Sequence, residues 1–507
     1  MDTNTILSVF LILFAVFVFL GFYAARWRKG DLSQIHEWSL AGRRLGTWLA
    51  FFLVGADLYT AYTFVAIPSA VHGSGALFFY AVPYVLSTFG IALIFGPKLW
   101  KVTRARGYIT GSDYVRGRFD SRGLGVLTAV VGIVSLLPYI ALQIVGMQAV
   151  LAVLLLNTNL GSSAEDISLV LAFLVLAAFT FTSGLRGATL TAVFKDILIW
   201  VTVVAILVAV YTSVSDIGAK FATIKALPTG TLSLKAADSW NYLTYAIGSA
   251  FALYLYPHAV NGILSAQDER KLRLSTSLLP LYGVGLALLA LLGLLVYFVP
   301  SALAIVTSKT VGGGANYLGG LLTVPALAVT VLPAWLAGVA LLGIFVGGLV
   351  PAAIMAISQA NLLTRNIVKE FKPSLSERTE VRTAKWASAI FKFLALGFVF
   401  LLGNNFTYAV QLQLLGGVLI IQLLPSLFLT LYTNFFSKWA LAAGLIAGIV
   451  VGLILEYYES ASTGALQTFY STPIGGIFVA VIAVTVNLAI ALVLSSVTKG
   501  SRPTQPA

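Results

Sequence analysis

The sequence predicts an all-α integral membrane protein, and its composition and its pattern of apolar runs support this fold class. The chain has 507 residues, of which 59% are hydrophobic and only 10% are charged, and its mean hydropathy is +0.96. Apolar runs of about 20 residues, the length that crosses a bilayer, recur along almost the whole chain. We expect about thirteen membrane-spanning helices, with end errors of about four residues, at residues 5–25, 45–71, 76–100, 123–155, 167–184, 190–213, 240–263, 275–305, 333–363, 385–403, 406–433, 437–456 and 472–497.

The distribution of positive charge predicts the orientation of these helices. With thirteen spans and the N-terminus outside, nearly all of the 31 Lys and Arg residues fall on the cytoplasmic side. The four exceptions are Lys220, Lys225, Lys235 and Lys309. This bias is typical of multi-pass proteins and predicts a cytoplasmic C-terminus in a plasma-membrane protein. The net charge of +13 therefore serves topology and contact with anionic lipid, not nucleic-acid binding.

One transmembrane domain accounts for nearly the whole chain. The longest polar stretches, residues 101–123 and 364–386, are only long enough for loops. The apolar run Ile6–Leu20 is expected to be a retained first helix, because its positive charges follow it instead of preceding it. We expect a single transporter domain over residues 1–499 and a disordered cytoplasmic tail over residues 500–507.

An acidic residue inside the second span is the most informative polar position. Asp57 is the only formally charged residue between Arg44 and Lys98, and a charge at the bilayer centre costs about 2.5–3.5 kcal/mol on insertion scales. Gly55 and Pro68 weaken the helix around it. Its neighbours with hydroxyl groups are Tyr59, Thr60, Tyr62 and Thr63. Polar side chains beside an interrupted helix predict a binding site at membrane depth, and therefore a carrier.

A second interrupted helix is predicted by the inverted repeats that many carriers contain. If the second span opens one five-helix repeat, over about 45–213, the seventh span opens the other, over about 240–433. Pro257 removes a helical hydrogen bond in the seventh span, and Tyr254 and Asn261 supply polar groups there. We therefore expect the substrate to lie between Asp57–Thr63 and Tyr254–Asn261.

The most specific stretch is the loop after the third span. Residues 101–122 read KVTRARGYITGSDYVRGRFDSR, which resembles the cytoplasmic signature of the sodium:solute symporter family, where a Thr, an Asp/Glu-Tyr pair and an Arg-Phe recur at this spacing. The match extends to Tyr139–Gln148 and Pro257–Arg273 and covers roughly residues 5–430. The resemblance implies the LeuT-like fold, with two inverted five-helix repeats. The helices outside the repeats are then 5–25, 437–456 and 472–497.

Within the family, several stretches are most similar to prokaryotic monocarboxylate permeases. They are Gly55–Phe64, Ser183–Arg186, Phe194–Asp196, Val350–Met355 and Asn361–Asn366. The resemblance implies cation-coupled symport of a short acid such as lactate or pyruvate. The alternatives are a sodium-coupled symporter of an amino acid or another small solute, and an uncoupled uniporter or channel. Gln143 and Gln413 are candidate substrate contacts, although interhelical hydrogen bonding explains an intramembrane Gln about equally well.

The coupling ion is predicted to be either sodium or a proton. The resemblance implies a sodium ion held between backbone carbonyls of the second span, near Ala56 and Asp57, and a Ser/Thr pair of the ninth. Two registers of the match place that pair at Val350–Pro351 or at Ala356–Ile357, neither of which has hydroxyls, with Ser358 next along. Such a cage needs about six oxygens, by analogy with other hard cations.

Asp196 favours the proton. It resembles an element of the family that holds an additional cation or a proton, and a buried carboxyl is suited to that task. In the alternative interpretation, Lys195 and Asp196 end their helix near the cytoplasmic headgroups, where Lys snorkels.

Other classes of protein are not indicated. The chain has no GxSxG, P-loop, HExxH or DxDxG motif, so we expect no enzyme. It has no cysteine, and therefore no disulfide or thiolate metal site. The three histidines, His36, His72 and His258, are too far apart to suggest a metal cluster. We expect no cofactor, and as partners only a small-molecule substrate, a coupling cation and the lipid bilayer, with no nucleic acid and no obligatory protein partner.

Overall fold

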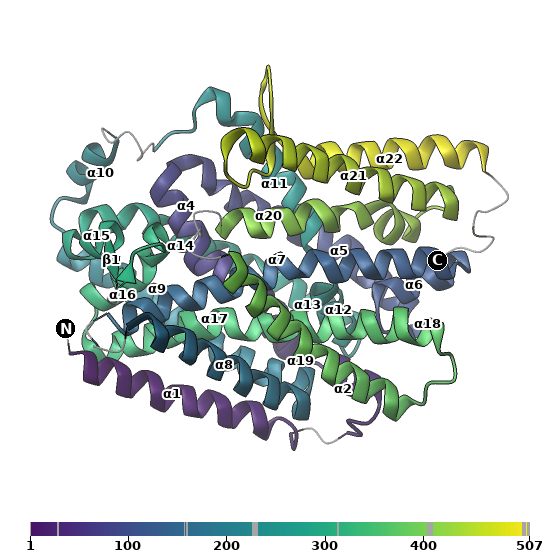
Figure 1. The fold of residues 1–507 in the computed structure, drawn as a ribbon, viewed down its shortest axis with the longest axis horizontal. Coiled ribbons are helices and arrows are strands. Elements are labelled where there is room, and N and C mark those ends of the chain that lie inside the picture. Colours follow the sequence, from purple (N-terminus) through teal and green to yellow (C-terminus); the bar gives the residue numbers. More distant parts are fainter. Residues whose placement is uncertain are drawn as a thin grey trace.

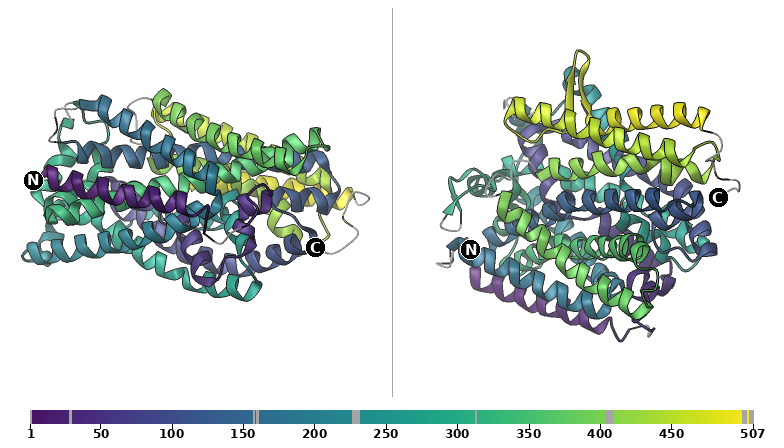
Figure 2. Two further views of the ribbon diagram at one scale, coloured as in Figure 1. Left: turned by 90° about the horizontal axis from the view of Figure 1, so that it is seen from below. Right: turned by 45° about the vertical axis from the view of Figure 1, so that its right-hand side comes forward.

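The structure of the protein is a computed structural model, which describes residues 2–27, 30–156, 158, 161–225, 232–311, 314–402, 409–498 and 503. Long helices run along the longest axis of the molecule and lie side by side in every view (Figures 1 and 2). The first helix begins at one end of this bundle and the last helix ends at the other (Figure 1). The predicted disordered tail lies outside the described residues, apart from residue 503.

Eleven continuous helical stretches in the described part of the chain are long and apolar enough to cross a membrane. Their principal helices are α1 (Thr3–Tyr23), α5 (Ala81–Arg106), α7 (Arg122–Leu154), α8 (Gly161–Ser183), α9 (Leu185–Ser213), α13 (Glu269–Leu278) with α14 (Pro280–Leu295), α17 (Ala334–Asn361), α19 (Glu377–Leu402), α20 (Ala409–Ile420), α21 (Lys438–Thr463) and α22 (Val479–Val497). They agree with the predicted all-helical membrane architecture.

The predicted spans 45–71 and 240–263 are not continuous helices. The first divides into α3 (Thr47–Leu58), a π-helical turn η2 (Tyr62–Ala66) and α4 (Ile67–Ser74). The second divides into α11 (Ser239–Leu253) and α12 (Pro257–Ser265). Both interruptions fall where helix-weakening residues predicted them. Each exposes backbone groups that a continuous helix would have paired internally.

Helix α17 forms the centre of the bundle. It packs against α1, α7, α9 and α19, and nearly all of its residues from Ala337 to Asn361 are buried. A helix that is apolar on every side is one surrounded by other helices. Small residues allow close approach, since a Cβ on Gly348 would lie 2.8 Å from the backbone oxygen of Gln143. This packing places α17 beside both interrupted helices.

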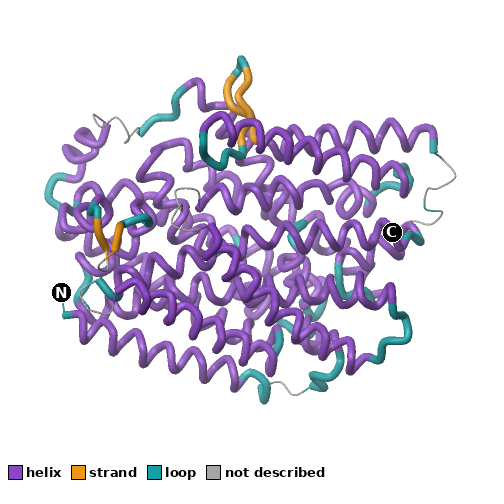
Figure 3. The backbone as a smooth tube through the Cα atoms, viewed as in Figure 1, coloured by secondary structure: helices purple, strands orange, loops and turns teal. Residues whose placement is uncertain are grey.

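Shorter elements cover the two ends of the bundle. Near the start of α1 lie α10 (Ile217–Lys225), α15 (Pro300–Thr307), α16 (Thr323–Val331) and the hairpin of β1 (Thr310–Val311) and β2 (Gly314–Ala315) (Figures 1 and 3). Near the end of α22 lie α6 (Gly111–Phe119) and α18 (Lys369–Phe371) (Figure 1). The remaining helical turns are α2 (Ile35–Leu40), η1 (Ala41–Arg43), η3 (Gly75–Tyr80), η4 (Ala236–Asp238), η5 (Val296–Phe298), η6 (Gly319–Leu322), η7 (Leu362–Val368), η8 (Ile421–Leu423), η9 (Leu424–Phe428) and η10 (Leu429–Leu431).

The predicted start of the last helix, at residue 472, is wrong. Residues 469–478 form an antiparallel hairpin of β3 (Phe469–Thr472) and β4 (Gly475–Phe478), and α22 begins only at Val479. Gly475 begins β4 directly after the turn at residues 473–474, with a φ of 119°, a conformation that glycine adopts without steric cost. The apolar residues of the hairpin pack against α11, and this tertiary contact is absent from the local sequence pattern.

Candidate transport site

The first interruption lies between α3 and η2. Tyr59 ends the helical conformation with φ −91° and ψ 81°. Two hydroxyl groups then replace the missing helical hydrogen bonds. Thr63 donates to the backbone oxygen of Leu58, and the side-chain oxygen of Thr60 accepts from the N–H of Tyr62 at 3.1 Å. The predicted hydroxyl residues therefore include two that stabilise the interruption itself.

Helix α7 supports the other side of this interruption. The side-chain oxygen of Gln143 accepts from the backbone N–H of Ala61 at 2.9 Å, and its amide group donates to the carbonyl of Tyr139 at 3.2 Å. Gln143, predicted as a substrate contact or an interhelical hydrogen bond, makes the interhelical bond in this structure. Its role toward substrate stays a prediction.

A lysine from α9 reaches the carbonyl oxygens that the interruption exposes. The Nζ of Lys195 lies 2.7 Å from the backbone oxygen of Tyr59 and 3.3 Å from that of Ala56. It also forms an ion pair with Oδ1 of Asp196 at 2.9 Å. Both charged side chains are 0% exposed, and Lys195 lies about 15 Å along its helix from Leu185. Lys195 and Asp196 are therefore part of the core, not the helix end near the headgroups.

Asp57 lies in the last turn of α3 and is only 2% exposed. Neither of its carboxylate oxygens has a hydrogen-bond partner among the described residues. It interacts electrostatically with both Lys195 and Asp196. Buried polar groups are almost always paired, so this unpartnered acid at a helix interruption is an exception that needs an explanation.

The second interruption lies between α11 and α12. Tyr256 is extended, with φ −60° and ψ 138°, and Pro257 begins α12 at a position where its missing N–H costs nothing. The hydroxyl of Tyr254 has no partner among the described residues. Asn261, one turn into α12, donates to the hydroxyl of Ser358 at 2.9 Å. This hydrogen bond joins α12 to α17.

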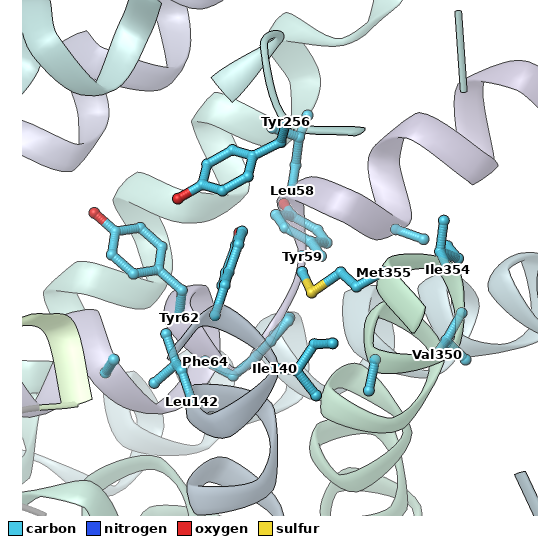
Figure 4. Close-up of a cluster of buried hydrophobic side chains, with 14 of the residues drawn as sticks. Leu58, Tyr59, Tyr62, Phe64, Ile140, Leu142, Tyr256, Val350, Ile354 and Met355 are labelled. Carbon is cyan, nitrogen blue, oxygen red and sulfur yellow. The ribbon is translucent and has the colours of Figure 1, made fainter. Parts of the chain in front are cut away.

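Ser358 and Gln413 complete the predicted set. The hydroxyl of Ser358 donates to the carbonyl of Ile354 at 2.9 Å and accepts from Asn261 of α12. Its donor and its acceptor are therefore both used inside the protein. The side-chain oxygen of Gln413, on α20, is buried without a partner in the described chain. Its backbone oxygen accepts from the hydroxyl of Tyr256 at 3.3 Å. Figure 4 shows Leu58 of the first interruption lying near Tyr256 of the second.

Two predicted tyrosines face different surroundings. The ring of Tyr59 packs against Phe64, Trp200 and Tyr282, at centroid distances of 5.5, 5.7 and 4.5 Å. The hydroxyl of Tyr62 instead bonds that of Tyr80 at 2.9 Å. Tyr59 therefore presents its backbone oxygen to the interruption, while its ring fills the interface of α9 and α14.

A cavity of about 630 Å³ lies at the end of the bundle where α1 begins. It is lined by residues of α4, η6, the starts of α11 and α20 and the loop before β3, among them His72, Tyr245 and Gln411. The rings of Tyr80 and Tyr245 pack at 4.9 Å beside the Tyr62–Tyr80 hydroxyl pair. Contacts through Tyr245 and Tyr80 therefore link the lining of the cavity to Tyr62 of η2.

A polar cluster lies at the opposite end, and we call it the Asp113 clasp. Asp113 accepts from the N–H of Ile109 at 2.9 Å and from the side chain of Asn366 at 2.8 Å, and Arg365 lies 3.6 Å away. Thr110 donates to Asn366 at 2.8 Å. The clasp joins α6 to η7, and its Thr110 and Asp113 belong to the loop with the most specific sequence pattern.

The sequence interpretation missed the partners that complete this site. Tyr282 of α14 donates to Oδ2 of Asp196 at 2.6 Å, and Lys195 was assigned no role at the interruption. The signal available in the sequence was a Lys-Asp pair that begins at the eleventh residue of a long apolar helix. It did not reveal which way the flexible lysine side chain turns.

Comparisons with known proteins identify the family. The family model described as the sodium:solute symporter family matches residues 38–452. This chain belongs to that family. Members are secondary transporters, not enzymes, so the protein is a multi-pass protein of the plasma membrane that moves a solute together with a cation.

Individual relatives agree with this family. The monocarboxylate transport permease protein of Rhizobium johnstonii is 36% identical over 99% of both chains. The uncharacterized symporter YodF of Bacillus subtilis is 32% identical over 92% of this chain and 90% of its own. A solved structure of a Na⁺-coupled sialic acid symporter, in a substrate-bound outward-open state, has a TM-score of 0.72 over 97% of this chain and 98% of its own. At 18% identity it shows the shared LeuT-like fold alone.

Proposed function

We propose that this symporter carries a short monocarboxylate, such as lactate or pyruvate, across the plasma membrane. The observation that carries the proposal is the meeting of two interrupted helices around buried, unpaired polar groups in the described core. These groups are the carboxylate of Asp57, the hydroxyl of Tyr254 and the side-chain oxygen of Gln413. In carriers, such paired interruptions hold the substrate near the bilayer midplane.

The chemistry of α12 favours an anionic solute. Its N-terminus, at Pro257, opens beside Tyr254, and the positive end of a helix dipole attracts a carboxylate without a buried arginine. The Rhizobium relative, which shares 36% identity over nearly all of both chains, is named for monocarboxylate transport. We assign the substrate contacts to the two interruptions and their neighbours, namely Tyr59, Thr60, Tyr62, Thr63, Gln143, Tyr254, Asn261 and Gln413.

We further propose thirteen membrane-spanning helices, with the N-terminus outside and the C-terminus inside. The first and last helices have their free ends at opposite ends of the bundle (Figure 1), as an odd number of spans requires. The charge distribution supports this orientation. The cavity near Tyr245 then faces the outside and the Asp113 clasp faces the cytoplasm, so that alternating access means opening one while the other closes.

Uptake into proteoliposomes tests the substrate. Labelled lactate, pyruvate and proline are offered separately under an imposed cation gradient, with unlabelled solutes as competitors. We expect saturable, uphill accumulation of lactate or pyruvate and competition among short monocarboxylates. Accumulation of proline alone would instead indicate an amino-acid symporter, and equilibration without accumulation would indicate a uniporter or channel.

A further inference from the structure

The ammonium group of Lys195 occupies a set of oxygens at the first interruption. An ammonium has three N–H donors. Three oxygens lie within 3.3 Å of this one, namely the backbone oxygens of Tyr59 and Ala56 and Oδ1 of Asp196. The side chain is fully buried. Any cation that used these two backbone oxygens would therefore have to displace the lysine.

The unpaired carbonyl oxygens at the end of α3 favour a cation at this position. In an uninterrupted helix the carbonyls of Ala56 and Tyr59 would accept from the N–H groups four residues later. The N–H of Thr63 instead bonds the carbonyl of Thr60 at 2.9 Å, because the chain turns there. Unpaired carbonyls at a helix C-terminus carry partial negative charge and favour a positive group. Lys195 supplies that charge from a neighbouring helix.

Other residues hold the ammonium in this position. Asp196 pairs with it and accepts from the hydroxyl of Tyr282 at 2.6 Å. Gly55 makes room for this tyrosine, since a Cβ at that position would lie 2.0 Å from the ring of Tyr282. The helices α3, α9 and α14 thus fit together around one buried charge.

Helix α17 carries no side-chain oxygen between Ala334 and Ile357. Figure 4 shows Met355 of this stretch near Tyr59, with Val350 and Ile354 on the same helix. A hard metal cation prefers about six oxygen ligands, and an ammonium needs only three acceptors. The oxygens described around Lys195 therefore match the three donors of its ammonium group, whereas α17 supplies no side-chain oxygen from this stretch to a sodium cage.

We infer that Lys195 is a built-in cation that holds the interrupted helix in the way a bound sodium ion would, so that transport by this protein needs no sodium. Lys195 is a positioning residue, because it acts on the backbone of α3 beside Asp57. Where uptake is the readout, the inference rests on the proposed function. A measurement on the protein alone keeps the two separable.

Thermal unfolding of the purified protein supplies that measurement. The melting temperature is compared in sodium chloride and in choline chloride at equal ionic strength, without substrate. A cation that binds the native state raises Tm with its concentration. We expect the same Tm in both salts for the wild type. We expect a higher Tm in sodium for Lys195→Ala, in which two backbone oxygens and the carboxylate of Asp196 have lost their cation. A saturable sodium-dependent rise in the Tm of the wild type would overturn the inference.

Uptake provides the second test, with another buried lysine as a control. Lys392 of α19 is equally buried, but its ammonium bonds the hydroxyls of Thr180 and Ser388, away from both interruptions. We expect wild-type uptake to be unchanged when choline replaces sodium. The uptake rate should fall at least tenfold in Lys195→Met, whereas Lys392→Met should retain most of its uptake. Full uptake by Lys195→Met at normal membrane abundance would contradict the inference that Lys195 replaces a sodium ion. Wild-type uptake that requires sodium would contradict it as well. If no tested solute is transported, the proposed substrate is wrong, while the melting comparison still decides the role of Lys195.

Discussion

The side-chain oxygen of Gln143 lies 2.9 Å from the backbone nitrogen of Ala61 and accepts its hydrogen bond, so α7, like Lys195 of α9, bonds the backbone of the interrupted helix. One turn further along α7, Gly146 allows the two helices to touch. A Cβ on Gly146 would lie 2.4 Å from the Cβ of Ala61. The geometry of the interruption therefore depends on a hydrogen bond and on the absence of one methyl group.

Gly146→Ala is expected to disrupt this contact. The position of the Cβ of Ala61 is fixed by the backbone, so one of the two helices must shift. This shift costs about 1–3 kcal/mol of folding free energy. We expect a lower melting temperature and reduced uptake at equal expression. Gly90→Ala is the matched control, because a Cβ there meets nothing within 4 Å. Equal behaviour of the two variants would show that the Gly146–Ala61 contact is not tight.

Much of the fold could be predicted from the sequence because bilayer-length apolar runs dictate helices. The interruptions at 45–71 and 240–263 were also predictable, since Gly55, Pro68 and Pro257 weaken a helix locally. The β3–β4 hairpin was not, because its strands depend on packing against α11. The short helix α16 was missed because it is not long enough to register as a span, and most of α15 was merged into the predicted span 275–305.

The site was only partly predictable. Asp57 could be recognised because a lone acid in an apolar segment is costly. The sequence also raised a question about the sodium cage, because neither Val350–Pro351 nor Ala356–Ile357 has hydroxyls. It did not reveal that Lys195 reaches the backbone oxygen of Tyr59, because this contact joins residues 136 positions apart in the chain. Side-chain direction on α9 becomes clear only when α3 and α14 are in place.

Asp57→Asn is expected to abolish or severely reduce uptake while leaving membrane insertion intact. The amide has nearly the same shape, but it removes the negative charge from a buried carboxylate that has no partner among the described residues. Asp216→Asn is the control, because that aspartate is exposed in a loop and asparagine tolerates its φ of 48°. Uptake is measured at matched surface expression. Near-normal transport by Asp57→Asn would remove Asp57 from the mechanism.

Substrate is expected to protect cysteines introduced at Thr63 or Gln413 from thiol reagents. The protein contains no cysteine, so all labelling reports the introduced residue. Both positions are buried near the interruptions, and a bound solute there should slow labelling several-fold. A cysteine at the exposed position 216 serves as the unprotected control. If saturating substrate leaves the labelling rates at positions 63 and 413 unchanged, the binding site lies elsewhere.

Loosening the Asp113 clasp is expected to open the cytoplasmic end. In Asp113→Asn the side chain loses its charge, and with it the attraction of Arg365 and one acceptor for Ile109. Hydrogen bonds to charged groups contribute about 1.5–3 kcal/mol. A cysteine at the buried neighbour Ser112 should then react faster with a reagent applied from the cytoplasmic side. Asp120→Asn, at the end of the same helix, should leave this rate unchanged. Equal rates in both variants would mean that the clasp does not hold that end closed.

The last prediction concerns the coupling ion and follows from counting charges in the core. Asp57, Lys195 and Asp196 are all buried and interact, so one ammonium faces two carboxylates. Buried charges are tolerated when they are compensated, and one additional proton would make this group neutral. We therefore expect an inward proton gradient to drive uptake at least as well as a sodium gradient.

Asp196→Asn should weaken the pH dependence of that uptake, because a single ammonium and a single carboxylate compensate each other without an additional proton. The measurement is accumulation in proteoliposomes across a range of pH with sodium absent, for the wild type and for this variant. Tyr282→Phe removes the hydroxyl that bonds Asp196 but keeps the charges, so it should preserve the pH dependence even if uptake slows. If substrate does not accumulate without sodium but accumulates strongly when sodium is restored, proton coupling is refuted. Sodium would then be the coupling ion.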